Sequence, residues 1–173
     1  MPLGPVIVIL LRLILPLSIL RYPLWGGILA MLLDGADVII AGWLNMGDFS
    51  SYHTTDKYLD MYYLTLEVYK SLSWQNALAC RTSMFLFIYR FVGVIWFEAT
   101  NLRILLFVFP NLFENFFLFF EAYRKIKKTE KLSWKGILIA LIILLIPKLV
   151  QEYLMHVVLL RPWDWFHTTF LKT

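Results

Sequence analysis

The sequence has almost no cysteine and lacks the signature motifs of several common enzyme classes. Its single cysteine, Cys80, excludes a disulfide within the chain and a metal site built from several cysteines. It contains no glycine-rich phosphate loop, no nucleophile elbow and no haem-attachment motif. No internal repeat, low-complexity segment or long linker divides the chain. We therefore expect a single domain over residues 1–173.

Charged residues are also scarce. They make up 16% of the 173 residues, whereas hydrophobic residues make up 60% and the mean hydropathy is +0.69. A soluble domain is about half apolar. The net charge of +4 is modest and reflects the loops of a membrane protein, so we expect no nucleic-acid partner. Because no basic stretch precedes the first apolar run, and Arg12 lies inside it, we expect no cleaved signal peptide.

The apolar residues that are present gather in long runs, such as 6–20, 103–120 and 136–150. A helix of about 20 residues crosses a bilayer, and tryptophans, which prefer the membrane–water interface, stand near the ends of these runs. The sequence therefore predicts an all-α integral membrane protein: a bundle of about six helices, five or six of them transmembrane, with the first short enough to lie in the interface instead. The expected helices are 5–20, 22–43, 54–73, 75–98, 102–126 and 133–160.

Prolines and small residues indicate how these helices bend and pack. Pro16, Pro110 and Pro147 fall inside expected helices and should kink them, because proline lacks the backbone N–H and clashes with the preceding turn. Gly27 and Ala30 continue in register with the acidic residues of the second helix. Small residues let a neighbouring helix approach closely, so this face should point into the bundle.

Two pairs of aspartates stand out. Asp34 and Asp37 are three residues apart on the second expected helix, and Asp56 and Asp60 are four apart on the third. Residues at these spacings share a helical face, and the two helices should be antiparallel neighbours, so the pairs can meet at one depth. Clustered carboxylates must take protons or counter-ions, and Mg²⁺ and Mn²⁺ bind such oxygens. Alternatively, each aspartate caps a helix or pairs with an arginine.

The order D-x2-D followed by D-x3-D resembles the signature of the CDP-alcohol phosphotransferases, which are six-helix integral membrane enzymes. The resemblance covers the second and third expected helices. It implies a divalent metal site, with Mg²⁺ or Mn²⁺ held by Asp34, Asp37, Asp56 and Asp60. It also implies that Asp60 is the catalytic base for an acceptor hydroxyl. The function would then be phospholipid-type phosphoryl transfer in lipid metabolism.

The sequence differs from that signature at its glycine and arginine positions. Val38 and Tyr52 stand in place of glycines, and no arginine follows Ala41. These differences favour an alternative in which the chain is a non-catalytic subunit or scaffold of a membrane complex that retains the enzyme fold. A third interpretation is a cation- or proton-binding transport protein, although the chain shows no inverted repeat.

Basic residues in the later apolar runs are candidates for phosphate or substrate binding. Arg81 and Arg90 fall on the fourth expected helix and Lys148 on the sixth. An arginine guanidinium matches the geometry of a phosphate or a carboxylate, so a salt bridge from Arg90 to an acid such as Glu98 is the alternative. In the scaffold interpretation the same three basic residues neutralise the aspartates.

A secondary polar cluster is expected between the last two helices, formed by Glu114, Glu152 and His156. Glu152 and His156 have the spacing of two metal ligands on one helix, whereas Lys148 and Glu152 equally suit an ordinary ion pair. Polar residues on nearly every expected helix predict a wet or ion-filled interior.

The charge distribution predicts an orientation in the membrane. Residues 124–135 carry six lysines and arginines, which favours a cytoplasmic location. Three helices separate them from residues 44–55, which should then lie on the other side with the aspartates. The CDP-alcohol phosphotransferases keep their motif in the cytoplasm, so charge and resemblance point in opposite directions. The expected partners are membrane lipids, together with a second copy of the chain or a larger membrane complex.

Overall fold

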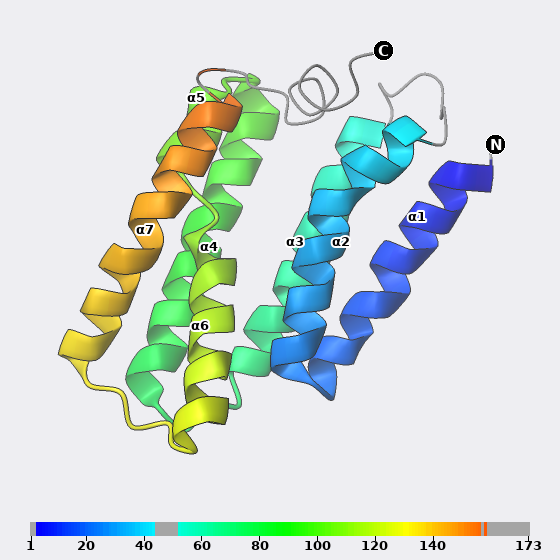
Figure 1. Cartoon of the computed structure of the whole chain (residues 1–173). Helices are drawn as coiled ribbons and strands as arrows, with labels where there is room; N and C mark the ends of the chain where they lie inside the picture. Colours follow the sequence, from blue (N-terminus) through cyan, green and yellow to red (C-terminus); the bar gives the residue numbers. More distant parts are fainter. Residues whose placement is uncertain (1–2, 44–51, 157, 159–173) are drawn as a thin grey trace, which may run out of the picture.

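The computed structural model describes residues 3–43, 52–156 and 158, and every regular element within these ranges is a helix (Figure 1). The predicted all-helical bundle is confirmed, with the first and fifth expected helices each divided in two. The elements are α1 (Leu3–Ile14), the 3₁₀ helix η1 (Leu15–Leu20), α2 (Pro23–Trp43), α3 (Tyr52–Ser71), α4 (Ala77–Thr100), α5 (Ile104–Val108), α6 (Leu112–Lys127) and α7 (Trp134–His156).

Proline accounts for both divisions. Pro16 stands at the start of η1, where α1 tightens into 3₁₀ geometry. Pro110 lies between α5 and α6. Because proline has no backbone N–H to donate, the helix is interrupted there. Pro147 behaves differently: α7 continues through it as one helix.

The helices form a bundle in which α6 is central and contacts α2, α3, α4 and α7. Residues 21–22, 72–76 and 128–133 connect helices at one end of the bundle, and we call this the connected end (Figure 1). The last turn of α2 and the first turn of α3 lie at the opposite end. The location of these two ends on opposite sides of a membrane stays a prediction.

The core is built around one aromatic face of α6. Phe113, Phe116, Phe117 and Phe120 follow helical spacing, and all four are fully buried. Trp74, just after α3, packs against them with ring centroids 5.8 Å from Phe117 and 4.4 Å from Phe120. The sequence placed every tryptophan near a run end. Trp74 does lie there, but only 5% of it is exposed, so it serves the core instead of the interface.

Glycines permit two close helix contacts. A Cβ on Gly27 of α2 would lie 2.8 Å from the side chain of Leu118 and 3.0 Å from Oε1 of Glu67, so α2 packs tightly on α6 and α3 as predicted. A Cβ on Gly93 of α4 would lie 2.2 Å from Cβ of Phe109. Gly93 therefore lets α4 approach the break between α5 and α6.

The interior of the bundle contains many polar side chains. They come from α1, α3, α4 and α7, and from α6 together with the residue before it. The buried polar residues in the described part of the chain are Arg12, Glu67, Ser71, Ser83, Asn111, Glu114, Glu121, Lys148 and Glu152.

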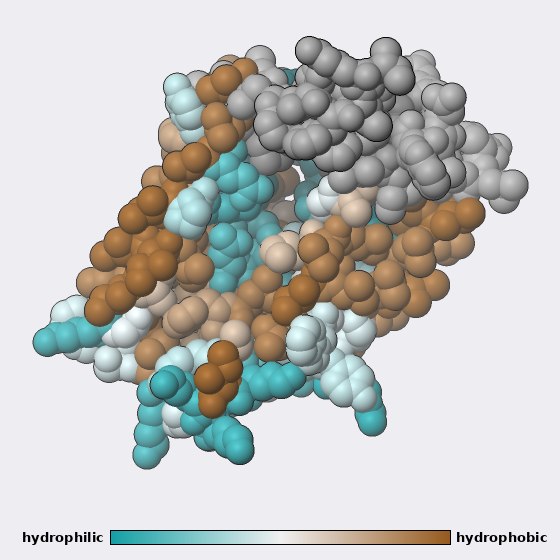
Figure 2. All heavy atoms as spheres, in the orientation of Figure 1, coloured by the Kyte–Doolittle hydropathy of each residue, from teal (hydrophilic) through white to brown (hydrophobic). Residues whose placement is uncertain are grey.

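The outer surface is mainly apolar. Figure 2 shows hydrophobic surface over α7 and over α1 and α2, with hydrophilic residues at the connected end and in a patch between these two hydrophobic areas. Large aliphatic side chains such as Ile139, Ile143 and Ile146 of α7 are more than half exposed. Three helical stretches of the described chain are long and apolar enough to cross a membrane: Ala77–Thr100, Ile104–Lys127 and Trp134–Leu154.

Candidate functional site

An arginine joins two of the four aspartates that the sequence expected to converge. Arg12 of α1 is 3% exposed, and its Nη2 donates to Oδ1 of Asp34 on α2 at 2.5 Å and to Oδ1 of Asp60 on α3. About a third of each aspartate side chain remains exposed (34% and 31%). Because one nitrogen touches both carboxylates, the two acids lie close together.

The two acids also share a depth in the bundle. Asp34 lies eleven residues after Pro23, and Asp60 lies eleven residues before Ser71, so each is about 16 Å along its helix from the connected end. The antiparallel pairing of α2 and α3 produces this match. The structure thus brings Asp34 and Asp60 together at one depth, as their spacing predicted, but that depth is near the middle of the bundle and not near one end, where the sequence placed the aspartates.

The remaining predicted ligands are only partly described. Asp37 and Asp56 lie one turn further from the connected end, in α2 and α3, but their side chains fall outside the described residues, as does that of His156. Within the described residues, no group of three or more histidine, cysteine, aspartate and glutamate side chains is placed to hold a metal ion. The roles of the four aspartates as metal ligands, and of Asp60 as a base, stay predictions.

The donor set allows a test of fit for Mg²⁺ or Mn²⁺. The oxygens of Asp34 and Asp60 are the right kind of ligand for a hard divalent cation. However, the Arg12 guanidinium lies against Oδ1 of both. A cation bound to these oxygens would meet another positive charge at short range. With Arg12 in this position, the pair fits an ion-paired site and does not fit a metal site.

A second polar network joins α3, α6 and α7. Tyr63 Oη donates to Glu114 Oε1 at 3.0 Å, and Asn111 Nδ2 donates to Glu114 Oε2 at 3.1 Å. The backbone N–H of Asn111 also donates to Glu152 Oε1 at 3.3 Å, and Lys148 Nζ lies 3.5 Å from the same oxygen. Glu114 and Glu152 therefore belong to one network, and Lys148 and Glu152 form the ion pair that their spacing allowed.

Glu67 stands apart from this network. Its side chain is fully buried beside Gly27, and neither carboxyl oxygen has a hydrogen-bond partner among the described residues. Oδ1 of Asn111 is likewise buried without a hydrogen-bond partner among the described residues. A buried polar atom without a partner costs free energy, most of all when it is charged. Glu67 follows Asp60 and Tyr63 at helical spacing and so lies on the same face of α3, but nothing near it in the sequence indicates that its carboxyl group lacks a partner.

The other predicted phosphate ligands occupy separate environments. Arg81 of α4 is exposed. Arg90 donates from Nη1 to the backbone carbonyl of Phe109 at 2.8 Å. Glu98, the acid suggested as its partner, pairs with Lys57 at 2.5 Å.

Arg12 is the residue that sequence reasoning missed. From the sequence, Arg12 is a charge within the first apolar run, and no partner is predicted for it. The available signal was general: an arginine inside an apolar helix requires an acidic partner at its own depth. Asp34 and Asp60 on the next two helices are such partners.

Comparisons of the chain with protein-family models, with curated proteins and with solved structures find no match. The structure itself defines the class. The described chain is an all-helical bundle with three stretches able to cross a membrane, an apolar exterior, an aromatic core on α6 and several buried polar side chains, among them Arg12.

Proposed function

We propose that this chain is an integral, multi-pass membrane protein. The apolar exterior and the buried charges support this, because a soluble protein rarely exposes large continuous apolar surfaces and rarely buries charged side chains. Here Ile143 and Ile146 of α7 face outward, whereas Arg12 and Glu67 are buried. In this proposal the apolar helix α2 and the more polar helix α3 cross with the rest of the bundle, with their charged side chains turned inward.

Within the membrane, we propose that the protein is a non-catalytic subunit or scaffold that keeps an enzyme-like helical layout. The observation that carries this proposal is the placement of Arg12 between Asp34 and Asp60. A guanidinium has several donors in one plane, so it can neutralise two carboxylates at once. It takes the place that a shared metal ion would need.

The rest of the interior also supports a structural role. Glu114 accepts from Tyr63 and Asn111, and Glu121 accepts from Trp74 Nε1 at 2.6 Å and from Arg124 at 2.7 Å. Acids engaged in this way hold helices together.

The second candidate is the metal-dependent phosphotransferase that the aspartate order suggests. The convergence of Asp34 and Asp60 favours it, since acids of both helices meet at one depth with Asp37 and Asp56 one turn away. In this candidate Asp60 takes the proton of an acceptor hydroxyl, a role that contributes about 10²–10⁴-fold in rate.

Metal-dependent stability separates the two candidates without a known substrate. The thermal unfolding of the purified protein in detergent is followed with and without millimolar Mn²⁺ or Mg²⁺, for wild type, Asp60→Asn and Arg12→Gln. A ligand at about 100 times its Kd adds roughly 2.7 kcal/mol to the stability of the state that binds it. The scaffold proposal expects no metal effect on the wild type.

The outcomes are distinct. Stabilisation of the wild type by Mn²⁺ that Asp60→Asn abolishes would reject the scaffold proposal in favour of the phosphotransferase. Stabilisation that appears only in Arg12→Gln supports the view that the guanidinium excludes the metal. The matched control is Glu98→Gln, which removes an acid that pairs with Lys57 elsewhere in the bundle.

A further inference from the structure

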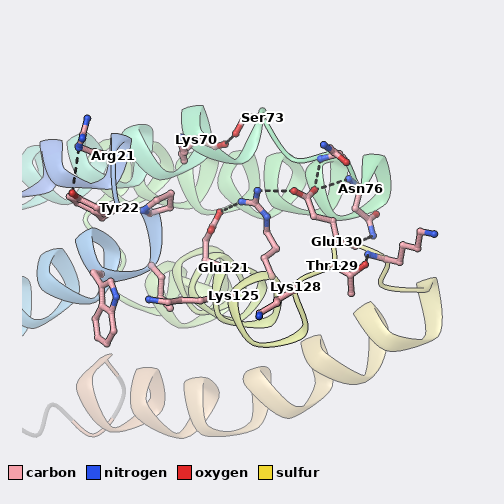
Figure 3. Close-up of a pocket in the computed structure, with 16 residues that line it drawn as sticks. Arg21, Tyr22, Lys70, Ser73, Asn76, Glu121, Lys125, Lys128, Thr129 and Glu130 are labelled. Carbon is pink, nitrogen blue, oxygen red and sulfur yellow. Dashed lines mark hydrogen bonds and ion pairs between the residues drawn. The ribbon is translucent and has the colours of Figure 1, made fainter.

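A cavity of about 910 Å³ opens at the connected end of the bundle (Figure 3). Its walls come from the start of α2, the corner between α3 and α4, and the end of α6 with the residues that follow it. Acidic side chains are few in these walls and basic ones are many. The basic lining residues are Arg21, Lys70, Arg124, Lys125, Lys128 and Lys131.

The two acids in the lining are already engaged. Arg124 pairs with Glu121 and with Glu130, at 2.7 Å in each case. Glu121 also accepts from Trp74 Nε1, and Glu130 accepts from the backbone N–H of Gln75 at 2.5 Å. One arginine thus balances part of the charge of both acids, and the lining keeps a formal charge of +4 from its six basic and two acidic residues.

The rim of the cavity has the composition of a membrane interface. Trp25 and Tyr22 are 60% and 58% exposed, and Nζ of Lys125 lies 4.7 Å from the centre of the Trp25 ring. Ile126, beside Lys125, is 75% exposed. Aromatic rings, lysines and an exposed aliphatic side chain in one place match the headgroup level of a bilayer. The positive end of the α2 helix dipole also faces this cavity, because α2 begins at Pro23 in its wall.

We propose that this cavity binds a phosphate-bearing anion, supplied by the headgroup of an anionic phospholipid. Lysine and arginine are the side chains that bind phosphate, and clusters of them next to a membrane helix attract anionic lipids. The site stands apart from Asp34 and Asp60, which lie about 16 Å away along α2 and α3. It therefore does not depend on whether those acids hold a metal.

The test measures binding to the full chain purified in a non-ionic detergent. The probes are dioctanoyl phosphatidic acid, dioctanoyl phosphatidylcholine and inorganic phosphate. The pocket variant is Lys125→Gln with Lys128→Gln. The matched control is Lys127→Gln with Lys135→Gln, which removes the same charge from the same region but outside the cavity lining. Unfolding temperatures without a probe verify that both variants are folded.

The pocket variant should bind phosphatidic acid about 25-fold more weakly, at about fivefold for each lysine, while the control stays within about twofold of wild type. Saturable binding of phosphatidic acid but not of inorganic phosphate supports the lipid source. If only inorganic phosphate binds, the cavity is a phosphate site, but the proposal that a phospholipid supplies the phosphate is wrong. Equal weakening in both variants, equal binding of phosphatidylcholine, or no saturable binding of any probe overturns the site.

Discussion

Arg12 shows how much one side chain can decide in a helical bundle. It lies on α1, yet it joins α2 to α3 through Asp34 and Asp60. A buried charge that loses its partner is strongly destabilising. If the guanidinium is removed, two carboxylates that share one partner become neighbours of like charge.

Replacing this arginine should therefore destabilise the fold. We expect Arg12→Gln to lower the free energy of unfolding by about 1–3 kcal/mol, less than for fully buried acids because Asp34 and Asp60 are about a third exposed. Adding Asp60→Asn to Arg12→Gln should restore part of the loss, because it removes the repulsion. Denaturant titration in detergent measures both, with the exposed Arg103→Gln as control. An unchanged stability for Arg12→Gln would contradict the ion-paired site.

Replacing Glu67 should have the opposite effect and increase the stability of the fold. Its buried carboxyl group has no hydrogen-bond partner in the described chain, so an apolar side chain of similar length should fit better. We predict that Glu67→Met raises the free energy of unfolding by about 1–3 kcal/mol. Thermal or denaturant unfolding at neutral pH measures the change. A clear loss of stability would mean that a proton, an ion or water satisfies Glu67 in the native protein, and the cation- or proton-binding interpretation would gain.

At the scale of elements, the break between α5 and α6 explains the position of Arg90. The helix stops at Pro110, which leaves backbone carbonyls without helical partners. Two side chains of α4 donate hydrogen bonds to these carbonyls. Tyr89 Oη donates to the carbonyl of Val108 at 2.7 Å, and Arg90 donates to the carbonyl of Phe109 at 2.8 Å. This hydrogen bond gives Arg90 a structural role in joining α4 to the break.

The corner between α3 and α4 depends on a single capping residue. Asn76 accepts from the backbone N–H groups of Leu78 and Ala79 at 3.1 and 3.0 Å, and its amide donates to the carbonyls of Glu130 and Leu132 at 2.8 and 3.0 Å. It both begins α4 and ties α4 to the segment between α6 and α7.

Loss of this cap should be costly for a surface position. We expect Asn76→Ala to lower the free energy of unfolding by about 1–2 kcal/mol, since it removes an N-cap together with contacts to the neighbouring loop. The adjacent Gln75→Ala should change it by less than about 0.5 kcal/mol, because Gln75 uses its backbone N–H to reach Glu130. Equal effects of the two substitutions would show that the cap is unimportant.

At the scale of the whole molecule, the two ends of the bundle differ in charge. The connected end carries the basic residues of 124–135, whereas the last turn of α2 and the first turn of α3 lie at the other end. If the bundle crosses a membrane, the two ends face different compartments, and the charge rule places the connected end in the cytoplasm.

Cysteine labelling in intact cells tests this orientation. After Cys80→Ala, a cysteine at Ser50 should react with a membrane-impermeant maleimide from outside, and one at Thr129 should react only after permeabilisation. Both substitutions leave the basic residues intact, so the charge distribution is unchanged. The reverse pattern would show that the positive end lies outside, and it would agree with the cytoplasmic motif of the CDP-alcohol phosphotransferases.

The sequence by itself determined the elements of this protein. Helix limits follow from local features, because apolar runs set the length and prolines such as Pro16 and Pro110 set the breaks. The inward face of α3, with Asp60, Tyr63 and Glu67, follows from helical spacing alone. The meeting of Asp34 and Asp60 was also predictable, since consecutive antiparallel helices bring equal depths together.

Only the tertiary structure decided which groups these residues meet. Arg12 is 48 residues from Asp60, and Trp74 is 47 residues from Glu121, yet each pair forms a hydrogen bond. The basic cavity likewise collects residues from three separate parts of the chain. Such contacts depend on how helices rotate and pack against α6. That rotation is set by the combined fit of many side chains, so no local pattern in the sequence specifies it.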